Sequence, residues 1–283
     1  METIHRSQQM QETAAALKRG GRRIGFVPTM GFLHEGHLSL MREARRRTDV
    51  LVVSIFVNPA QFGPGEDLDT YPRDPEKDER LCREVGVDLL FFPDVGEIYP
   101  PGFQTYVSLE QLPRGLCGRS RPVFFRGVAT VVTKLFNIVQ PDVAVFGEKD
   151  FQQLAIIRRL VTDLDFPIQI IGGATVREPD GLAMSSRNAY LEAHQREAAL
   201  SLSRALWRAR ERVADGAADA REVLREAEAS IAAHEGTRID YIAIVDPGTL
   251  EPVATIAGST RMILAVWVGK TRLIDNMALE TRV

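Results

Sequence analysis

The sequence predicts an α/β protein with a Rossmann-like, doubly wound parallel sheet and a smaller C-terminal α+β domain. Short runs of Val, Ile, Leu and Phe alternate with amphipathic helical patterns through residues 1–175. These runs lack polar alternation, which is typical of strands buried on both faces of a parallel sheet. Beyond residue 176, two long helical patterns precede further short apolar runs. We therefore expect a second domain over residues 176–283.

In the first domain we expect strands and helices to alternate along the chain. The expected strands are 23–28, 49–56, 87–92, 142–147 and 167–172. The expected helices between them are 36–47, 75–85, 127–139 and 150–163, preceded by an N-terminal helix indicated by the spacing of Met10, Ala14 and Leu17. Ligands bind beyond the carboxyl ends of the strands in such sheets, so the residues after each strand are candidate site residues.

The second domain is expected to combine two helices with a small antiparallel sheet. The helical patterns cover residues 193–214 and 218–234, and they are rich in Ala, Arg and Glu. The apolar runs at 239–247, 250–256 and 261–269 are typical of strands.

Composition and charge exclude several classes of protein. With 45% hydrophobic and 26% charged residues, the chain resembles an ordinary globular protein. A net charge of −3 argues against a nucleic-acid-binding protein, and the basic run at 42–47 is better explained as a solvated helix face. Two cysteines without metal-like spacing favour a reducing compartment. No signal peptide or membrane span is evident, so we expect a soluble, cytoplasmic protein.

Two long loops interrupt the first domain. Residues 58–74 are crowded with Gly, Pro and Asp, and residues 110–123 carry several Gly and Arg residues. Loops of this length inside a compact domain are usually lids or binding loops.

The segment after the first strand of the sheet is the strongest candidate for a site. A turn containing Gly31 opens a helix that carries His34 and His37 on one face, with Gly36 between them. Amide groups and the dipole at a helix start favour a phosphate, and imidazole N–H groups could donate to its oxygens. Alternatively, the histidines bind zinc or are structural. A zinc site needs at least a third ligand, and no other histidine has a suggestive context.

Two further segments suit a nucleotide. Gly147, Lys149 and Asp150 follow the fourth strand, where the lysine could contact phosphate and the aspartate a ribose hydroxyl. Ser185 and Arg187, near the domain boundary, suit a triphosphate bound on domain closure. The alternatives are helix capping in the first segment and a simple linker in the second.

Together these segments resemble one family. The order of PTMGFLHEGH, VSIFVNPAQF, GEKDFQQL and DGLAMSSRNAYL, followed by TRLIDN at 271–276, is similar to that of the pantothenate synthetases (pantoate–β-alanine ligases). The HEGH and SSR segments also resemble the HIGH and KMSKS signatures of the wider nucleotidyltransferase superfamily. The resemblance covers nearly the whole chain.

The resemblance implies an ATP-dependent ligase that forms a pantoyl adenylate and pyrophosphate, then transfers the pantoyl group to β-alanine and releases AMP. It implies Mg²⁺ with ATP, a homodimer, a first domain that binds nucleotide and pantoate with a flap over about 58–74, and a lid role for the second domain. Gln61 and Gln153 would bind pantoate, and Gln61 also β-alanine. Lys149, Ser185, Ser186 and Arg187 would act with His34 and His37 in catalysis. The implied ATP site comprises Met30, Gly31, Phe32, Leu33, His34, Glu35, Gly36, His37, Gly147, Glu148, Lys149, Asp150, Val176, Met184, Ser185, Ser186 and Arg187.

Two positions depart from the family pattern. Phe124 stands where many members carry a histidine, whose place Arg126 could take, and Lys77 interrupts an acidic segment. Asp78 in that segment is a candidate Mg²⁺ ligand that the departure puts in doubt. The alternatives to the ligase are another nucleotidyltransferase of the superfamily, which would keep a nucleotidylated product, and a nucleotide-sensing protein without turnover.

Overall fold

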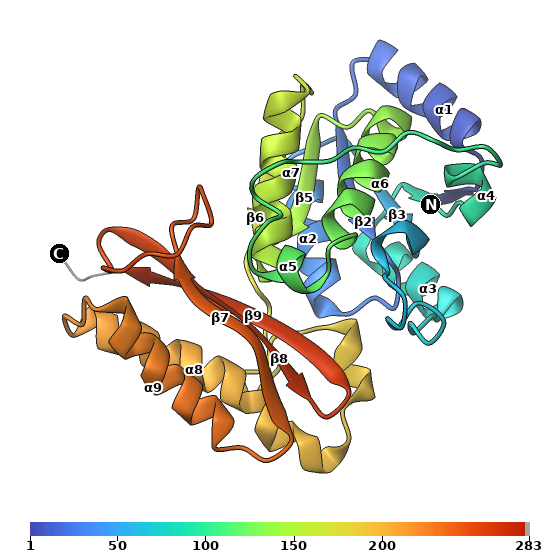
Figure 1. Cartoon of the computed structure of the whole chain (residues 1–283). Helices are drawn as coiled ribbons and strands as arrows, with labels where there is room; N and C mark the ends of the chain where they lie inside the picture. Colours follow the sequence, from blue (N-terminus) through green and yellow to red (C-terminus); the bar gives the residue numbers. More distant parts are fainter. Residues whose placement is uncertain (281–283) are drawn as a thin grey trace. The chain divides into compact units, whose positions relative to one another are not determined.

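The structure is a computed structural model and describes residues 1–280. The chain contains two compact units (Figure 1). The first unit consists of Met1–Glu110, Arg121–Glu148 and Ile156–Ala174, and the second of Gln111–Ser120, Lys149–Ala155 and Thr175–Val283. The last change of unit falls between Ala174 and Thr175. Two short segments taken from the earlier part of the chain also join the second unit, and one of them contains Lys149.

The first unit is built on a parallel sheet, with six strands within residues 1–280. Its order is β1–β4–β3–β2–β5–β6. The chain runs outward from β2 to β3 on one side, and β5 lies on the other side of β2. The carboxyl ends of β2 and β5 therefore flank the topological switch point, where such sheets bind ligands. The strands are β1 (Glu2–Ile4), β2 (Ile24–Thr29), β3 (Val50–Ile55), β4 (Leu89–Phe91), β5 (Val143–Gly147) and β6 (Gln169–Gly173).

Helices cover both faces of this sheet, as the unbroken apolar strands predict. On one face α1 (Ser7–Arg19) packs against α6 (Phe124–Val139), and both contact β2. On the other face α2 (Glu35–Arg45) packs against α3 (Pro75–Val85), and their apolar sides join β2, β3 and β5 in one core (Figure 1). The remaining helices up to residue 163 are η1 (Pro59–Gln61), α4 (Val95–Ile98), α5 (Cys117–Ser120), η2 (Glu148–Asp150) and α7 (Phe151–Asp163).

Local sequence explains where α3 begins and ends. Asp74 is its N-cap, and its carboxylate accepts the amide of Lys77 at 3.1 Å. Pro75 follows in the first helical position, where its missing N–H is not needed. Gly86 ends the helix with a φ of 81°, a left-handed conformation that glycine adopts without strain.

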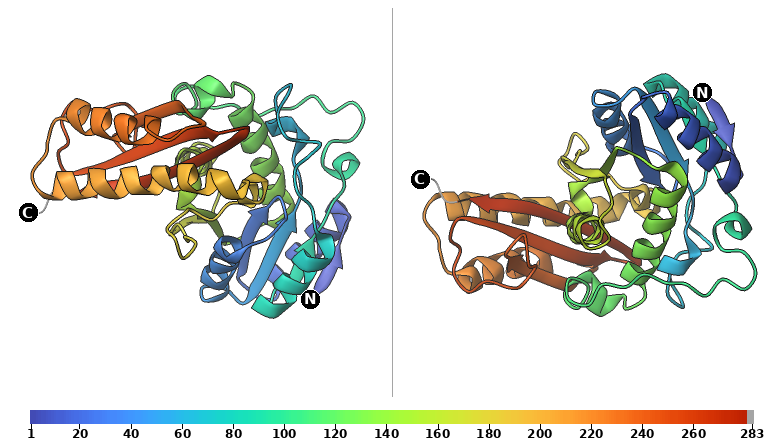
Figure 2. Two further views of the ribbon diagram at one scale, coloured as in Figure 1. Left: turned by 90° about the horizontal axis from the view of Figure 1, so that it is seen from below. Right: turned by 90° about the horizontal axis from the view of Figure 1, so that it is seen from above.

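The second unit pairs an antiparallel sheet with two helices. Its strands are β7 (Thr237–Val245), β8 (Ser259–Val268) and β9 (Thr271–Glu280), in that order across the sheet. Helices α8 (Arg196–Ala214) and α9 (Ala220–Ala232) run side by side along it (Figures 1 and 2). Alanine and leucine from α8 interlock with apolar residues of β8 and β9 in a separate core. The segment before α8 contains η3 (Ser186–Tyr190) and η4 (Ala193–Gln195).

The strand expected at 250–256 is wrong, and β9 is the third strand instead. Asp246 ends β7 by accepting the amides of Gly248 and Thr249, which starts a turn. Leu250 has a φ of 62°, and the following residues form only isolated bridges. The chain reaches an extended conformation again at Ser259.

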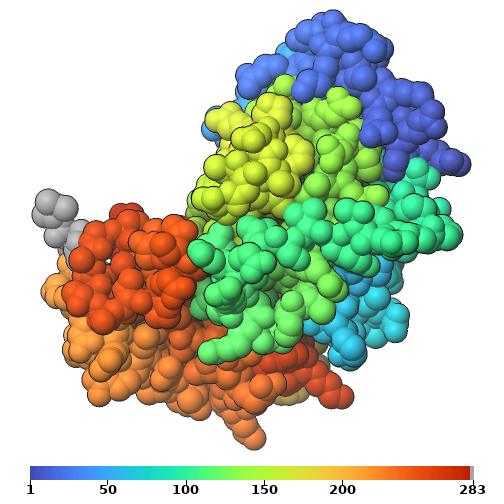
Figure 3. Space-filling model, turned by 45° about the horizontal axis from the view of Figure 1, so that its top comes forward, coloured from blue at the N-terminus to red at the C-terminus, as the bar shows by residue number. Residues whose placement is uncertain are grey.

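Much of the segment before α6 runs over the surface of the first unit. Residues 101–106 are mostly exposed, and Figure 3 shows this part of the chain, in green, as a band on the outside. None of the helices in residues 1–280 is long and apolar enough to span a membrane.

Candidate functional site

The turn that follows β2 has an unusual backbone. Gly31 and Phe32 both have positive φ values, 83° and 50°. Thr29 supports the first residue of the turn, because its hydroxyl accepts the Gly31 amide at 3.2 Å and donates to the Ser54 carbonyl at 2.8 Å. Glycine fits the first position without strain, whereas the left-handed phenylalanine must be held by its surroundings.

Asp78 of α3 holds this turn. One carboxylate oxygen accepts the Phe32 amide and the other accepts the Leu33 amide, each at 2.7 Å. The Asp78 side chain is buried, with 2% of the residue exposed. Burial raises the pKa of the carboxyl, and the amides of Leu33 and Phe32 act in the opposite direction. The turn is thus fixed by a residue that is distant in the sequence.

The space around the turn also selects its residues. A Cβ on Gly31 would lie 2.9 Å from an Asp78 oxygen and 3.0 Å from Ile55, closer than side chains normally pack. Lys77, the departure from the family pattern, places its ammonium 5.0 Å from the centre of the Phe32 ring. This cation–π contact gives the lysine a packing role beside the turn.

The turn delivers His34 and His37 to the start of α2. Their rings lie 4.0 Å apart between centroids. Nδ1 of His37 accepts the His34 backbone amide at 3.3 Å, so the ring proton of a neutral His37 lies on Nε2. The arrangement places a defined N–H donor at the positive end of a helix, which favours a phosphate oxygen. Leu33 and Leu38 on either side are buried and anchor the segment.

Gln61 lies beside the same turn. Its amide nitrogen donates to the sulfur of Met30 at 3.2 Å, and its oxygen accepts from Asn58 at 3.0 Å. Asn58 is 1% exposed and also bonds Tyr99 and the Gly127 carbonyl. The structure thus brings two sequence-predicted site residues, Gln61 and Met30, into direct contact. Asn58, which is not among the predicted site residues, orients Gln61. An Asn-Pro pair separated by two residues from the end of a buried strand is the signal that indicates Asn58.

A charged contact joins the two long loops of the first domain. Arg121 donates to the carboxylate of Glu66 at 2.8 Å and to the Gln61 carbonyl at 3.2 Å. Its guanidinium also lies 3.9 Å from the centre of the Phe124 ring. Arg126, expected as a substitute for the missing histidine, instead lies over Tyr106. Arg121 is therefore the cation next to Phe124, and it ties the 110–123 loop to Gln61 and Glu66 of the 58–74 loop.

The second nucleotide segment begins at the adjacent strand. Gly147 ends β5 and Glu148 follows, so both lie at the carboxyl end of the strand that pairs with β2. The first unit therefore gathers Met30, Gly31, Gly147 and Glu148 along the edge of the sheet at its switch point.

In the second unit a hairpin leads to the serine pair. The Met184 amide donates to the Val176 carbonyl at 2.9 Å, which pairs two residues of the ATP site that the family resemblance implies. The hairpin turns at Gly181, whose φ is 98°. Ser185 then caps η3 by accepting the Arg187 amide at 3.3 Å, and Ser186 is 8% exposed.

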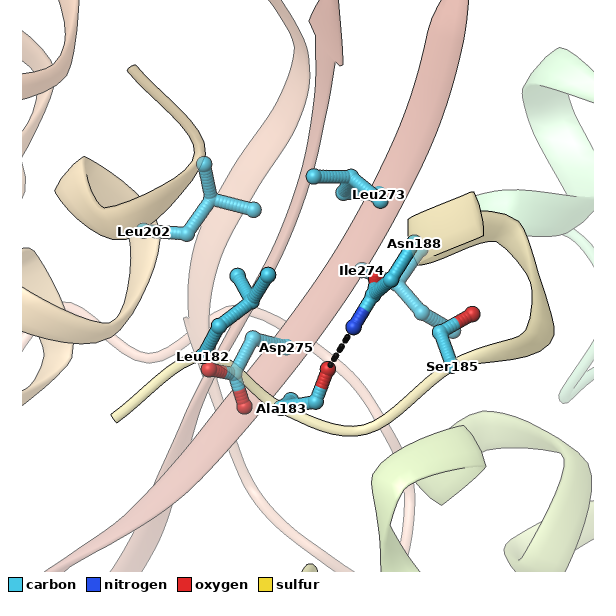
Figure 4. Close-up of a pocket in the computed structure, with 8 residues that line it drawn as sticks. All are labelled: Leu182, Ala183, Ser185, Asn188, Leu202, Leu273, Ile274 and Asp275. Carbon is cyan, nitrogen blue, oxygen red and sulfur yellow. Dashed lines mark hydrogen bonds between the residues drawn. The ribbon is translucent and has the colours of Figure 1, made fainter. Parts of the chain in front are cut away.

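The hairpin is tied to β9 by a buried ion pair. Arg177 donates through both terminal nitrogens to Asp275, at 2.6 and 2.9 Å, and also to the Gly181 carbonyl at 3.1 Å. Burial raises the pKa of the Asp275 carboxyl, and the Arg177 charge opposes that shift. Figure 4 shows Asp275 beside the segment of Leu182 and Ala183, with the Asn188 amide bonded to the Ala183 carbonyl.

The short segment Lys149–Ala155, which follows Glu148, also belongs to the second unit. The Lys149 ammonium lies 3.4 Å from the Asp150 carboxylate, and the Lys149 carbonyl accepts from Asn276 at 2.8 Å. Gln152 is buried and holds the 111–120 segment by hydrogen bonds. Its amide nitrogen donates to the Leu112 and Gly115 carbonyls, and its oxygen accepts the Cys117 amide. Gln153, assigned to pantoate, is half-buried. Of these two adjacent glutamines, Gln152 thus has a structural role.

A magnesium ligand role is not supported for Asp78, because both of its oxygens accept amides and the group is buried. Among the described residues, no three His, Cys, Asp or Glu side chains are grouped as a metal site.

Comparisons with known proteins agree on one family. The family model described as pantoate–β-alanine ligase matches residues 2–278. The pantothenate synthetase of Desulfatibacillum aliphaticivorans is 59% identical, covering 99% of this chain and 100% of its own. The solved pantothenate synthetase from Thermus thermophilus is 50% identical with a TM-score of 0.93, covering 98% and 99% of the two chains. The solved ligase from Francisella tularensis, "Complexed with Beta-gamma ATP and Beta-alanine", is 34% identical with a TM-score of 0.82, covering 98% and 97%.

We expect Asp78→Asn to destabilise the protein by about 1–3 kcal/mol, because the new amide NH₂ would face a backbone N–H and leave a buried donor unsatisfied. Urea unfolding followed by circular dichroism measures the change. Glu79→Gln, one residue along the same helix and partly exposed in an ion pair with Arg83, is the control and should change stability by less than about 0.5 kcal/mol. Equal stability of the two variants would show that the carboxylate does not hold the turn.

Proposed function

Because the chain belongs to the pantoate–β-alanine ligase family, we propose that it joins pantoate to β-alanine in two steps at the expense of ATP. In the first step a carboxylate oxygen of pantoate attacks the α-phosphorus of ATP, and pyrophosphate leaves. In the second step the amine of β-alanine attacks the acyl carbon of the pantoyl adenylate. AMP leaves with the oxygen that came from the carboxylate, and an amide bond remains.

The observation that carries this proposal is the arrangement of His34 and His37 at the start of α2. A helix N-terminus with an oriented Nε2–H donor stabilises negative charge on phosphate oxygens. Charge accumulates there as pyrophosphate departs, so we assign the transition-state contact to His37 and a supporting phosphate contact to His34. Met30–Leu33, Glu35, Gly36, Gly147 and Glu148 would complete the ATP contacts of the first unit.

The second unit would supply the remaining ATP contacts. We assign Lys149, Ser185, Ser186 and Arg187 to the phosphates, since an ammonium, two hydroxyls and a guanidinium suit a polyphosphate. Asp150, Val176 and Met184 would contact the nucleoside. The bound nucleotide of the Francisella tularensis ligase supports ATP as the substrate. We also propose that this unit acts as a lid over the bound substrates.

Gln61 and Gln153 are proposed to bind pantoate. An amide side chain can donate to a carboxylate and accept from a hydroxyl, and pantoate offers both kinds of group. The contacts of Gln61 with Asn58 and Met30 fix its orientation in advance. Gln61 is also assigned to β-alanine, the second ligand named for the Francisella tularensis ligase.

Magnesium would enter with ATP. Within residues 1–280 there is no group of side chains suited to enclose a metal, whereas Mg²⁺ can be held largely by phosphates and waters. It would neutralise phosphate charge. A homodimer, which rests on the family resemblance, and a cytoplasmic location, which rests on the cysteine pattern of the sequence, complete the proposal.

We expect the protein to catalyse ATP–pyrophosphate exchange that requires pantoate, and we expect His37→Ala to slow this exchange by about 10²-fold, the contribution of one transition-state donor. Exchange of radiolabelled pyrophosphate into ATP measures both. Adding β-alanine should then yield pantothenate. The combination of pantoate-dependent exchange and pantothenate formation is not expected of a transferase that keeps a nucleotidylated product, nor of a sensor that binds ATP without turnover.

Deleting residues 63–67 should raise wasteful ATP hydrolysis relative to pantothenate formation, because the deletion removes Glu66 and its contact with Arg121. An adenylate hydrolyses readily when water reaches it, and a closed loop excludes water. The ratio of AMP to pantothenate, measured by chromatography at saturating substrates, checks this. A ratio equal to that of the intact protein would count against a flap role for the loop.

A further inference from the structure

The TRLIDN segment ends in two consecutive buried polar residues, Asp275 and Asn276, that the proposed chemistry does not use. They are 2% and 4% exposed and lie in the middle of β9. Neighbouring residues in a strand point to opposite faces of the sheet. Asp275 shares a face with Leu273 and Met277 of the apolar core, whereas Asn276 points to the other face. Apolar neighbours on β9 contribute to the core of the unit, so the core does not account for the two buried polar residues.

Each of the two residues holds a different segment that we assign to the phosphates of ATP. Asp275 binds Arg177, which also donates to the Gly181 carbonyl and so fixes the 176–184 hairpin leading into Ser185. Asn276 donates to the Lys149 carbonyl at 2.8 Å. One strand therefore connects both segments through adjacent residues.

The contacts of Asn276 are themselves constrained. Its side-chain oxygen accepts from Arg261, whose guanidinium lies 4.0 Å from the centre of the Phe151 ring. The backbone at Lys149 is thereby bound directly, and the ring two residues later is bound through Arg261. Asp275 is oriented in the same way, since it also accepts the Asn276 amide at 2.8 Å.

From these contacts we infer that Asp275 and Asn276 form a positioning pair that sets Lys149 and the Ser185–Arg187 segment in register with each other for phosphate binding. A flexible lysine and a short helical turn contribute to catalysis only when their backbones are fixed, because a displacement of about 1 Å can cost 10²-fold in rate. The inference rests on the proposed function for its kinetic consequence, whereas its structural consequence is independent of substrate.

The structural test is amide hydrogen exchange on three variants of the full chain. Asn276→Asp keeps the oxygen facing Arg261 and removes the donor to Lys149, so it should speed exchange in residues 149–152 and leave residues 176–188 within about twofold. Asp275→Asn should have the opposite pattern. Leu279→Ala, a buried change on the same strand, is the control for general destabilisation and should not favour either segment.

The kinetic test measures pantoate-dependent ATP–pyrophosphate exchange. Asn276→Asp should lower kcat by about 10-fold to 10²-fold more than Leu279→Ala does, and this loss should largely vanish in a Lys149→Ala background, because residues that act as a unit are not additive. If Lys149→Ala is inactive, the hydrogen-exchange pattern of the variants alone tests the positioning role of Asp275 and Asn276.

The positioning role would be overturned if each variant changed hydrogen exchange equally in residues 149–152 and 176–188. It would also be overturned if the kcat loss of Asn276→Asp were undiminished in the Lys149→Ala background. Wild-type protein without pantoate-dependent exchange would refute the proposed function and leave the hydrogen-exchange result as a separate test of the pair.

Discussion

The candidate site of the first unit depends on one carboxylate bonded to two backbone amides. Asp78 reaches from α3 to the turn after β2, and its two oxygens accept the amides of Leu33 and of Phe32, whose positive φ the backbone does not prefer. The start of α2 follows directly, so the placement of both histidines depends on this contact. The cost of burying a carboxylate is offset by two amide donors that would otherwise lack partners.

The second unit uses the same principle with different groups. Buried polar residues on β9 bond to segments from elsewhere in the chain, and apolar neighbours on the same strand supply the core. Polar contacts of this kind are directional, whereas apolar packing is tolerant of small shifts. The fold therefore takes its general stability from apolar contacts, and the positions of the candidate phosphate-binding segments are set by a few hydrogen bonds.

The sequence predicts the parallel sheet and the histidine turn because both leave local signals, namely unbroken apolar runs and a glycine turn before HxxH. It does not predict β9, because Arg272, Asp275 and Asn276 resemble loop residues until their partners are known. It also misassigns 250–256, where Asp246 starts a turn that apolar composition conceals.

Long-range partnerships are the other limit of the sequence. Asp78 resembles a metal ligand in sequence, and only the fold shows its oxygens committed to amides. The roles of Gln152 and Gln153 differ although they are adjacent, and the assignment of residues 149–155 to the second unit has no local signature within a continuous helical pattern.

The central claim is that pantoate is activated as an adenylate. The most direct measurement supplies pantoate labelled with ¹⁸O in its carboxylate, together with ATP and β-alanine, and determines by mass spectrometry where the label appears. Attack of the carboxylate on the α-phosphorus predicts one ¹⁸O atom in each AMP and none in pyrophosphate. Unlabelled AMP, or label in inorganic phosphate released with ADP, would contradict the account.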